Sequence, residues 1–259
     1  MNPCYFGSSK EPLFGIYHPP LSAATIRPAV LICPPLALEY MRAHWCLRRL
    51  ADQLAMAGFH VLRFDYYGTG DSAGNSEEAD VARWQEDIRC AADEVLEMSN
   101  SETLSIVGLR AGAALAATTQ GLHVHRAILW DPVVSGRTYV EQLRQLHRSL
   151  LDQHNAIGRY IEATPEELLG YSFPQRLQDE IELLDLRKAF PLNTNEVLLF
   201  SSKATKDLFD LDQALRSHGT ASRAQVLEDA GDWERFSSRE DALLPNSIPP
   251  AIVSALLEA

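Results

Sequence analysis

The sequence predicts an α/β fold in which a mostly parallel central sheet is covered by helices on both faces. Two observations predict it: short apolar runs alternate with amphipathic helical segments, and the connections between them are short. With 259 residues, of which 46% are hydrophobic, the chain is long enough for one large core. Because α/β folds of this size commonly stay undivided, we expect a single domain over residues 1–259.

Six short apolar runs predict the strands of this sheet. They cover residues 30–33, 61–64, 104–107, 127–130, 197–200 and 224–227. Apolar residues recur at helical spacing over 47–54, 81–95 and 208–216, an alanine-rich run covers 113–117, and a last helix begins near Pro249. Strand and helix therefore alternate along most of the chain.

The alternation is interrupted over residues 138–190, where helical segments at 139–151 and 164–186 are expected without a convincing strand. Insertions of this length in a compact domain are usually functional. We expect this one to form a helical lid over the ends of the parallel strands. A strand of the central sheet inside this range would contradict that expectation.

Charge and cysteine content exclude several classes of function. Asp and Glu number 35 against 23 Lys and Arg, and the net charge of −12 repels nucleic acid and anionic membranes. Neither a signal sequence nor a membrane-spanning apolar run is evident, so we expect a cytoplasmic protein without membrane insertion. The four cysteines are widely spaced without a CxxC pair, which predicts reduced thiols and no metal site. We expect no cofactor.

A five-residue turn, Gly108-Leu109-Arg110-Ala111-Gly112, joins the strand at 104–107 to the helix at 113–117. Glycines at both ends let the chain turn sharply and lift the middle side chain above the sheet, as in a nucleophile elbow. The middle residue here is Arg110. A glycine-tolerant turn with a surface arginine is the alternative interpretation.

Three stretches resemble the serine-aminopeptidase-like α/β hydrolases, and more closely the exosortase A system-associated hydrolase-like proteins of bacterial biosynthetic clusters. They are residues 33–44 (CPPLALEYMRAH), 62–74 (LRFDYYGTGDSAG) and 108–113 (GLRAGA), and residues 130–136 and 169–171 fit the same group. The resemblance spans most of the chain. It implies the α/β-hydrolase fold, a pocket under the lid and, in this subgroup, an elbow that often carries arginine.

The residue types that serine-hydrolase chemistry needs are missing. A triad requires a hydroxyl or thiol nucleophile, an imidazole and an orienting carboxylate. Arginine stays protonated, so Arg110 cannot attack a carbonyl. The last histidine, His218, precedes the last strand, and the loop 228–233, which should carry the imidazole, offers carboxylates and Trp233 instead. Asp207, near the expected acid position, is better explained as a helix cap.

Several acidic residues follow predicted strands, at the sheet edge where α/β folds bind ligands. If Arg110 is buried, it needs an acidic partner or an anionic ligand, and Glu39, Asp65 and Asp131 are the candidates. Two interpretations stay open. Arg110 holds a substrate carboxylate or phosphate, or it forms a structural ion pair that fills the former catalytic site.

Further residues complete the predicted site. Glu39, Asp131 and Asp232 are candidates for proton transfer. Candidates for substrate binding are Arg110, His44, Trp233 and the amides of Ala111 and Leu36, since Pro34 and Pro35 have no N–H to donate. His44 is alternatively a general base or a helix-start residue. Cys33 and Ser135 are the candidates for a displaced nucleophile, although a small buried core residue explains Cys33 better and a turn or helix-cap residue explains Ser135 better.

Three functions are compatible with these residues. The first is an unconventional enzyme of a bacterial biosynthetic pathway that acts on a peptide, acyl or glycolipid-like substrate without a triad. The second is a pseudohydrolase that binds a ligand or a partner enzyme, and the third is a hydrolase with a displaced nucleophile. The expected partner is a small-molecule, peptidyl or acyl substrate, and a homodimer is left open. We expect no reaction with serine-directed probes.

Overall fold

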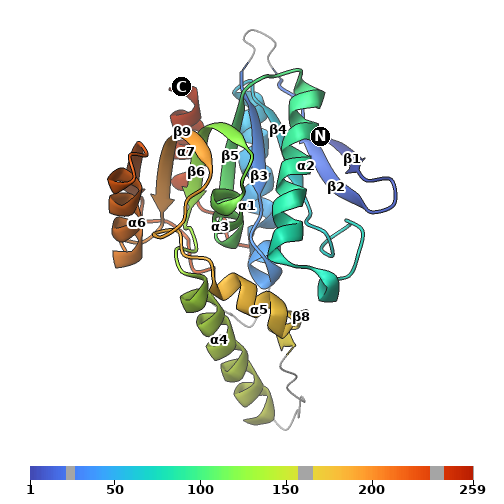
Figure 1. Ribbon diagram of the computed structural model, residues 1–259, viewed down its shortest axis with the longest axis vertical. Coiled ribbons are helices and arrows are strands. Elements are labelled where there is room, and N and C mark those ends of the chain that lie inside the picture. The colour runs from blue at the N-terminus through green and yellow to red at the C-terminus, as the bar shows by residue number, and fades with distance from the viewer. Residues whose placement is uncertain (22–26, 157–165, 234–241, 259) are drawn as a thin grey trace.

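The central sheet has eight strands in the order β1-β2-β4-β3-β5-β6-β9-β10 (Figure 1). The computed structural model describes residues 1–21, 27–156, 166–233 and 242–258. The strands from β4 to β10 are parallel, and β1 and β2 add an antiparallel edge. Their bounds are β1 Asn2–Gly7, β2 Pro12–His18, β3 Ala29–Cys33, β4 His60–Phe64, β5 Leu104–Leu109, β6 His123–Trp130, β9 Asn193–Ser201 and β10 Ser222–Val226.

The helices between these strands lie on both faces of the sheet, as the sequence predicts. They are α1 Ala37–Met56, α2 Val81–Ser99, α3 Ala111–Thr118, α6 Lys206–Ser217 and α7 Ile248–Leu257, with a short 3₁₀ turn at Ser76–Glu78. The buried side chains of α1 and α7 pack on one face, and those of α2, α3 and α6 pack on the other. The α/β fold class is therefore confirmed.

Side chains alternate along the buried strands, so that each strand contributes to two hydrophobic cores, one on each face of the sheet. In β3, Ala29, Leu31 and Cys33 face α2 and α3, whereas Val30 and Ile32 face α1 and α7. All five residues of β3 are buried, because a parallel strand covered on both faces has no solvent side.

The insertion between β6 and β9 lies at the carboxyl ends of the parallel strands, with α4 projecting away from the sheet (Figure 1). It contains α4 Gly136–Ala156, a small hairpin of β7 Glu167–Leu168 and β8 Tyr171–Ser172, and α5 Gln175–Glu182. The expected helix over 164–186 is wrong in extent, since only α5 is helical there. Residues 157–165 lie outside the described part. No described residue of 138–190 joins the central sheet.

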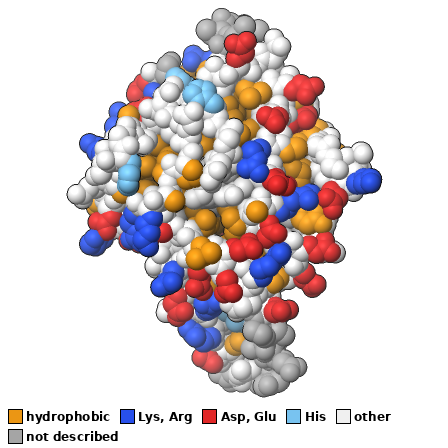
Figure 2. All heavy atoms as spheres, in the orientation of Figure 1, with side chains coloured by type: hydrophobic (Ala, Val, Ile, Leu, Met, Phe, Trp, Pro, Cys, Tyr) orange, Lys and Arg blue, Asp and Glu red, His pale blue; other side chains and the backbone are white. Residues whose placement is uncertain are grey.

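The surface around the insertion mixes charges of both signs. Figure 2 shows acidic and basic side chains interspersed over the end of the molecule that carries α4 and α5. Ion pairs such as Arg144–Glu182 and Arg148–Glu141 account for part of this pattern. Within the described residues, no helix is both long and apolar enough to cross a membrane.

Candidate functional site

The turn 108–112, which we call the elbow turn, places Arg110 at the start of α3. Arg110 is the residue before the first turn of the helix and has φ 54° and ψ −121°. Only a tightly held backbone keeps a non-glycine residue in this region, at a cost of about 1–3 kcal/mol. Gly112 is required as well, because a Cβ at this position would lie 2.2 Å from the carbonyl oxygen of Pro34.

Arg110 forms an ion pair with Glu39, one of its three predicted partners. Its Nε and Nη2 lie 3.0 and 2.9 Å from the same oxygen, Oε1 of Glu39. The hydroxyl of Tyr139, in α4, donates to Oε2 of Glu39 at 3.2 Å, and the Tyr139 ring lies 5.8 Å from the guanidinium carbon. The elbow turn, α1 and α4 therefore meet at one charge pair. The side chains of Arg110 and Glu39 are 14% and 3% exposed.

Asp131 is held by neighbours other than Arg110. Its Oδ1 accepts hydrogen bonds from the Ser201 hydroxyl, the Ser202 amide and the Ser202 hydroxyl, at 3.0, 2.7 and 3.1 Å. Its Oδ2 accepts from the Trp233 indole N–H at 2.8 Å. The Arg110 guanidinium reaches only the backbone carbonyl of Asp131, at 3.5 Å.

A cavity of about 510 Å³, which we call the elbow cavity, lies beside these groups at the ends of β6 and β9. Arg110, Asp131 and Trp233 line it together with the hydroxyl side chains Ser135, Thr138, Ser201, Ser202 and Thr205. Its volume is within the range of small-molecule sites. Among the described residues, no histidine lines it.

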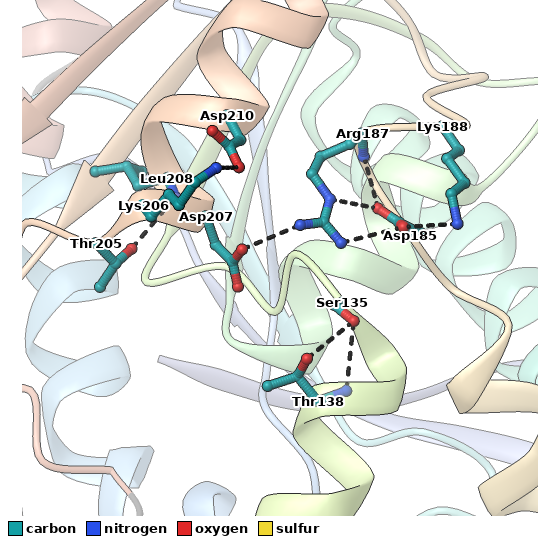
Figure 3. Close-up of polar contacts among 10 residues, drawn as sticks. All are labelled: Ser135, Thr138, Asp185, Arg187, Lys188, Thr205, Lys206, Asp207, Leu208 and Asp210. Carbon is teal, nitrogen blue, oxygen red and sulfur yellow. Dashed lines mark hydrogen bonds and ion pairs between the residues drawn. The ribbon is translucent and has the colours of Figure 1, made fainter.

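Ion pairs lie next to Asp207, which is one of the residues that line the elbow cavity. Figure 3 shows the Arg187 side chain between Asp185 and Asp207. Ser135 and Thr138 lie below this group in the view. Arg187 lies 2.8 Å from Asp185 and 3.0 Å from Asp207. The hydrogen bond from Arg187 is the main reason that the pKa of Asp185 is held below its usual range.

The loop after β10 closes the opposite side. Asp232 lines the cavity and pairs with Lys203, and Arg42 donates to the backbone carbonyls of Asp232 and Trp233 at 2.6 and 3.1 Å. Gly231 allows this loop to approach β9, since a Cβ there would meet the Ser202 hydroxyl at 1.9 Å.

Two of the predicted residues, Ser135 and Cys33, take the structural roles that were weighed for them, and a third, Asp207, does not. Ser135 caps α4, since its hydroxyl accepts from the Thr138 amide at 3.3 Å. Cys33 is fully buried, and burial raises the pKa of its thiol, so it is a poor nucleophile. The expectation that Asp207 caps a helix is wrong, because Thr205 caps α6 by accepting from the Leu208 amide at 3.2 Å.

The other predicted residues are spread over neighbouring spaces. Ala111 and Leu36 are buried at the starts of α3 and α1, and Leu36 lines a separate cavity of about 190 Å³. His44 lines a third cavity together with Asp65. Asp65 accepts from the Tyr40 hydroxyl at 2.5 Å and is not an Arg110 partner. The structure thus brings together Arg110, Asp131, Asp232 and Trp233, with Glu39 directly behind Arg110.

Sequence reasoning missed Tyr139, Ser201 and Ser202. The position of the two serines at the end of a predicted buried strand was a usable signal, since ligands bind at that edge. Tyr139 carried no such signal, because its contact with Glu39 joins residues 100 positions apart.

Comparison with known proteins decides the family. The family description serine aminopeptidase, S33, matches residues 29–197, which is more than half of the chain. The chain belongs to this family of serine aminopeptidases. No curated protein sequence matches it.

Solved α/β-hydrolase structures resemble this family member in fold across almost their whole length. A proline iminopeptidase from Mycobacterium smegmatis has a TM-score of 0.64 and 14% identity, covering 99% of this chain and 98% of its own. Est1E from Butyrivibrio proteoclasticus, solved with ferulic acid, has a TM-score of 0.62 and 13% identity, covering 98% and 96%. The bottromycin epimerase BotH, solved with bottromycin A2, has a TM-score of 0.59 and 18% identity, covering 99% and 100%.

Proposed function

We propose that this serine aminopeptidase family member is a pseudohydrolase that binds a small polar molecule in the elbow cavity, under the insertion 138–190 acting as a lid. The observation that carries the proposal is the pair formed by Asp131 and Trp233. It resembles the carboxylate–imidazole pair of a triad, with an indole N–H as the donor. An indole only donates, so Trp233 cannot take a proton from a nucleophile.

Among the described residues that line the elbow cavity, no imidazole takes the place of the base of a triad. Arg110 holds the nucleophile position and is neutralised by Glu39. Four donors contact the Asp131 carboxylate, three of them at Oδ1 and one at Oδ2, so the protein itself holds this group in place. Glu39, predicted to move protons, lies behind Arg110 and binds Arg110 and Tyr139. The Arg110–Glu39 pair thus supports the interpretation in which a structural ion pair fills the catalytic site.

The lining of the elbow cavity supports a polar ligand. Hydroxyl side chains from the end of β9 and from the starts of α4 and α6 face it. Such groups both donate and accept hydrogen bonds, which suits sugar hydroxyls and peptide or acyl amides. Burial of the Arg110–Glu39 pair in its wall makes an anionic ligand less suitable than a neutral one, because Glu39 already satisfies the guanidinium.

The second candidate function is an unconventional enzyme of a biosynthetic pathway, as in the exosortase-associated subgroup. The observation that favours it is the carboxylate of Asp232, which lines the cavity with Lys203 as its partner and can serve as a proton acceptor. A fold relative, BotH, is an epimerase, so this fold does accommodate reactions other than hydrolysis.

Ligand-observed NMR with three neutral probes, N-acetylglucosamine, N-acetyl-glycyl-glycine amide and p-nitrophenyl butyrate, tests the proposal. Thr138→Trp places a large side chain at the exposed cavity wall and should abolish binding. Gln145→Trp, on the same helix and exposed, is the matched control and should leave binding intact. The butyrate ester should turn over no faster than with denatured protein. Turnover by the wild type that is lost in Asp232→Asn would favour the second candidate function, an unconventional enzyme. If the Thr138→Trp variant binds the probes as well as wild type does, the elbow cavity is not the binding site.

A further inference from the structure

A second arginine, Arg63, lies inside the sheet where an apolar residue is expected. It is the fourth residue of β4, between Ile16 of β2 and Ile32 of β3 in the register of the sheet. These three side chains form a row on the face that α1 covers. Arg63 is 8% exposed, so a permanently charged group occupies a position in the core layer.

The protein does little to neutralise Arg63. Its Nε donates to Nε2 of His18 at 3.4 Å, and Nδ1 of His18 then donates to Asp52 at 2.9 Å. Because arginine only donates, the accepting His18 ring is neutral and brings no negative charge to Arg63. In the described part of the chain, Arg63 forms no ion pair and its Nη2 has no hydrogen-bond partner.

Asp65, one of the carboxylates whose charge acts on Arg63, is engaged elsewhere. Oδ1 of Asp65 accepts from the Tyr40 hydroxyl at 2.5 Å, and Oδ2 accepts from the Asp71 amide at 3.0 Å. Asp71 itself is exposed, so water screens its charge. An uncompensated buried guanidinium is costly, and natural proteins usually meet such a group with an anion.

A cavity of about 210 Å³ lies against Arg63, and we call it the arginine cavity. Tyr40, His44 and Leu47 of α1 form its roof, and Ile16 and Ile32 flank Arg63 on its floor. At about 30 Å³ per water molecule, this space holds one small organic molecule of roughly seven water volumes. Among the described residues, none lines both this cavity and the elbow cavity.

We propose that the arginine cavity is a binding site for a small apolar monocarboxylate whose carboxylate pairs with Arg63. The planar guanidinium fork matches a carboxylate, and Ile16, Ile32 and Leu47 suit a short hydrocarbon tail. Asp65 and Asp71, which line the same cavity, disfavour a doubly charged phosphate. This site is independent of the function proposed for the elbow cavity.

Isothermal titration with isovalerate is the direct test, and the alcohol 3-methylbutanol is the matched probe without a carboxylate. We expect isovalerate to bind with a Kd of about 1 mM or tighter and the alcohol at least about tenfold more weakly. Ile16→Trp, which fills the cavity from its half-buried edge, should abolish binding. Met56→Trp, at the exposed end of α1, is the control and should bind as wild type does.

Arg63→Met separates binding from folding. Replacing an unpaired buried charge by an apolar side chain of similar length should leave the free protein at least as stable while binding is lost. If Arg63→Met fails to fold, the loss of isovalerate binding in Ile16→Trp still tests the proposal. Absence of saturable isovalerate binding at about 10 mM, equal binding of the alcohol, or undiminished binding by either variant would overturn the proposal. Stronger binding of inorganic phosphate than of isovalerate would overturn it too.

Discussion

Arg110 and Arg63 are both largely buried, and they differ in what surrounds the charge. Arg110 has two nitrogens on one oxygen of Glu39 and a tyrosine ring beside it. Arg63 has a single long hydrogen bond to a neutral imidazole and a cavity against it. The comparison teaches that an arginine at the expected catalytic position needs no ligand when a carboxylate of the protein neutralises it. An arginine inside a strand without such a carboxylate indicates a ligand-binding site.

The same contrast supports the proposal that the elbow cavity holds a ligand without activating it for reaction. Every charged group at its inner wall already has a protein partner: Arg110 with Glu39, and Asp131 with Ser201, Ser202 and Trp233. Such mutual satisfaction stabilises a structure but leaves no group poised to attack a substrate. The cavity is therefore better suited to holding a molecule than to transforming it.

The largest effect is expected when the Arg110 pair is broken. Glu39→Gln removes the carboxylate that pairs with the buried Arg110 guanidinium and should lower the free energy of unfolding by about 3–5 kcal/mol. Urea unfolding measures it. Glu141→Gln, which alters an exposed pair with Arg148, should leave stability almost unchanged. A Glu39→Gln variant as stable as this control would remove the distinction between the two arginines.

A double variant sharpens the same point. Arg110→Met combined with Glu39→Leu removes both charges and should recover most of the stability lost in Glu39→Gln, because an apolar pair needs no neutralisation. Equal instability of the double variant would show that packing, and not charge, holds the elbow turn.

The next effect concerns the indole that stands where an imidazole is expected. Trp233→Phe removes the hydrogen bond to the buried Asp131 and should cost about 1–3 kcal/mol more than Trp130→Phe. Trp130 is a matched control, since it packs against Trp233 and its indole N–H has no partner within the described residues. Equal losses in the two variants would mean that the Asp131 contact contributes nothing measurable.

A smaller, pH-dependent effect extends the comparison to a buried carboxylate. Burial raises the pKa of Asp87 to about 6, although the Tyr67 amide and Arg83 act against the rise. The folded state therefore binds a proton more tightly than the unfolded state, so this group's contribution to stability falls as pH rises from about 4 to about 6. Asp87→Asn should therefore gain stability relative to wild type as the pH rises from about 4 to about 6, with the difference vanishing near pH 4. A pH-independent difference would contradict this.

Most of the sheet was predictable because its central strands are continuous apolar runs. β1 and β2 were not predicted, since β2 alternates buried and half-buried residues around Gly15 and forms the sheet's edge with β1. Within the insertion, the hairpin of β7 and β8 has only two residues per strand, too few for any periodic signal.

The candidate site was predictable only where neighbouring strand ends bring residues together. β3 and β5 are parallel neighbours, so the groups after them, Glu39 and Arg110, meet as expected. The Asp131–Trp233 contact spans 102 positions, and loop geometry alone determines it. Arg63 was not among the predicted site residues, although the sequence did carry a signal for it, because it is a charged residue inside the apolar run 61–64.

Labelling with a serine-directed fluorophosphonate tests the central claim most directly. Such probes need a serine activated by an imidazole, and removal of a triad member typically lowers kcat by roughly 10⁴-fold. We predict no labelling of the native protein above a denatured control, and none in Arg110→Ser, since no histidine among the described residues lines the elbow cavity. Stoichiometric labelling of the wild type, mapped by mass spectrometry to Ser135 or another serine, would contradict the account and favour a hydrolase with a displaced nucleophile.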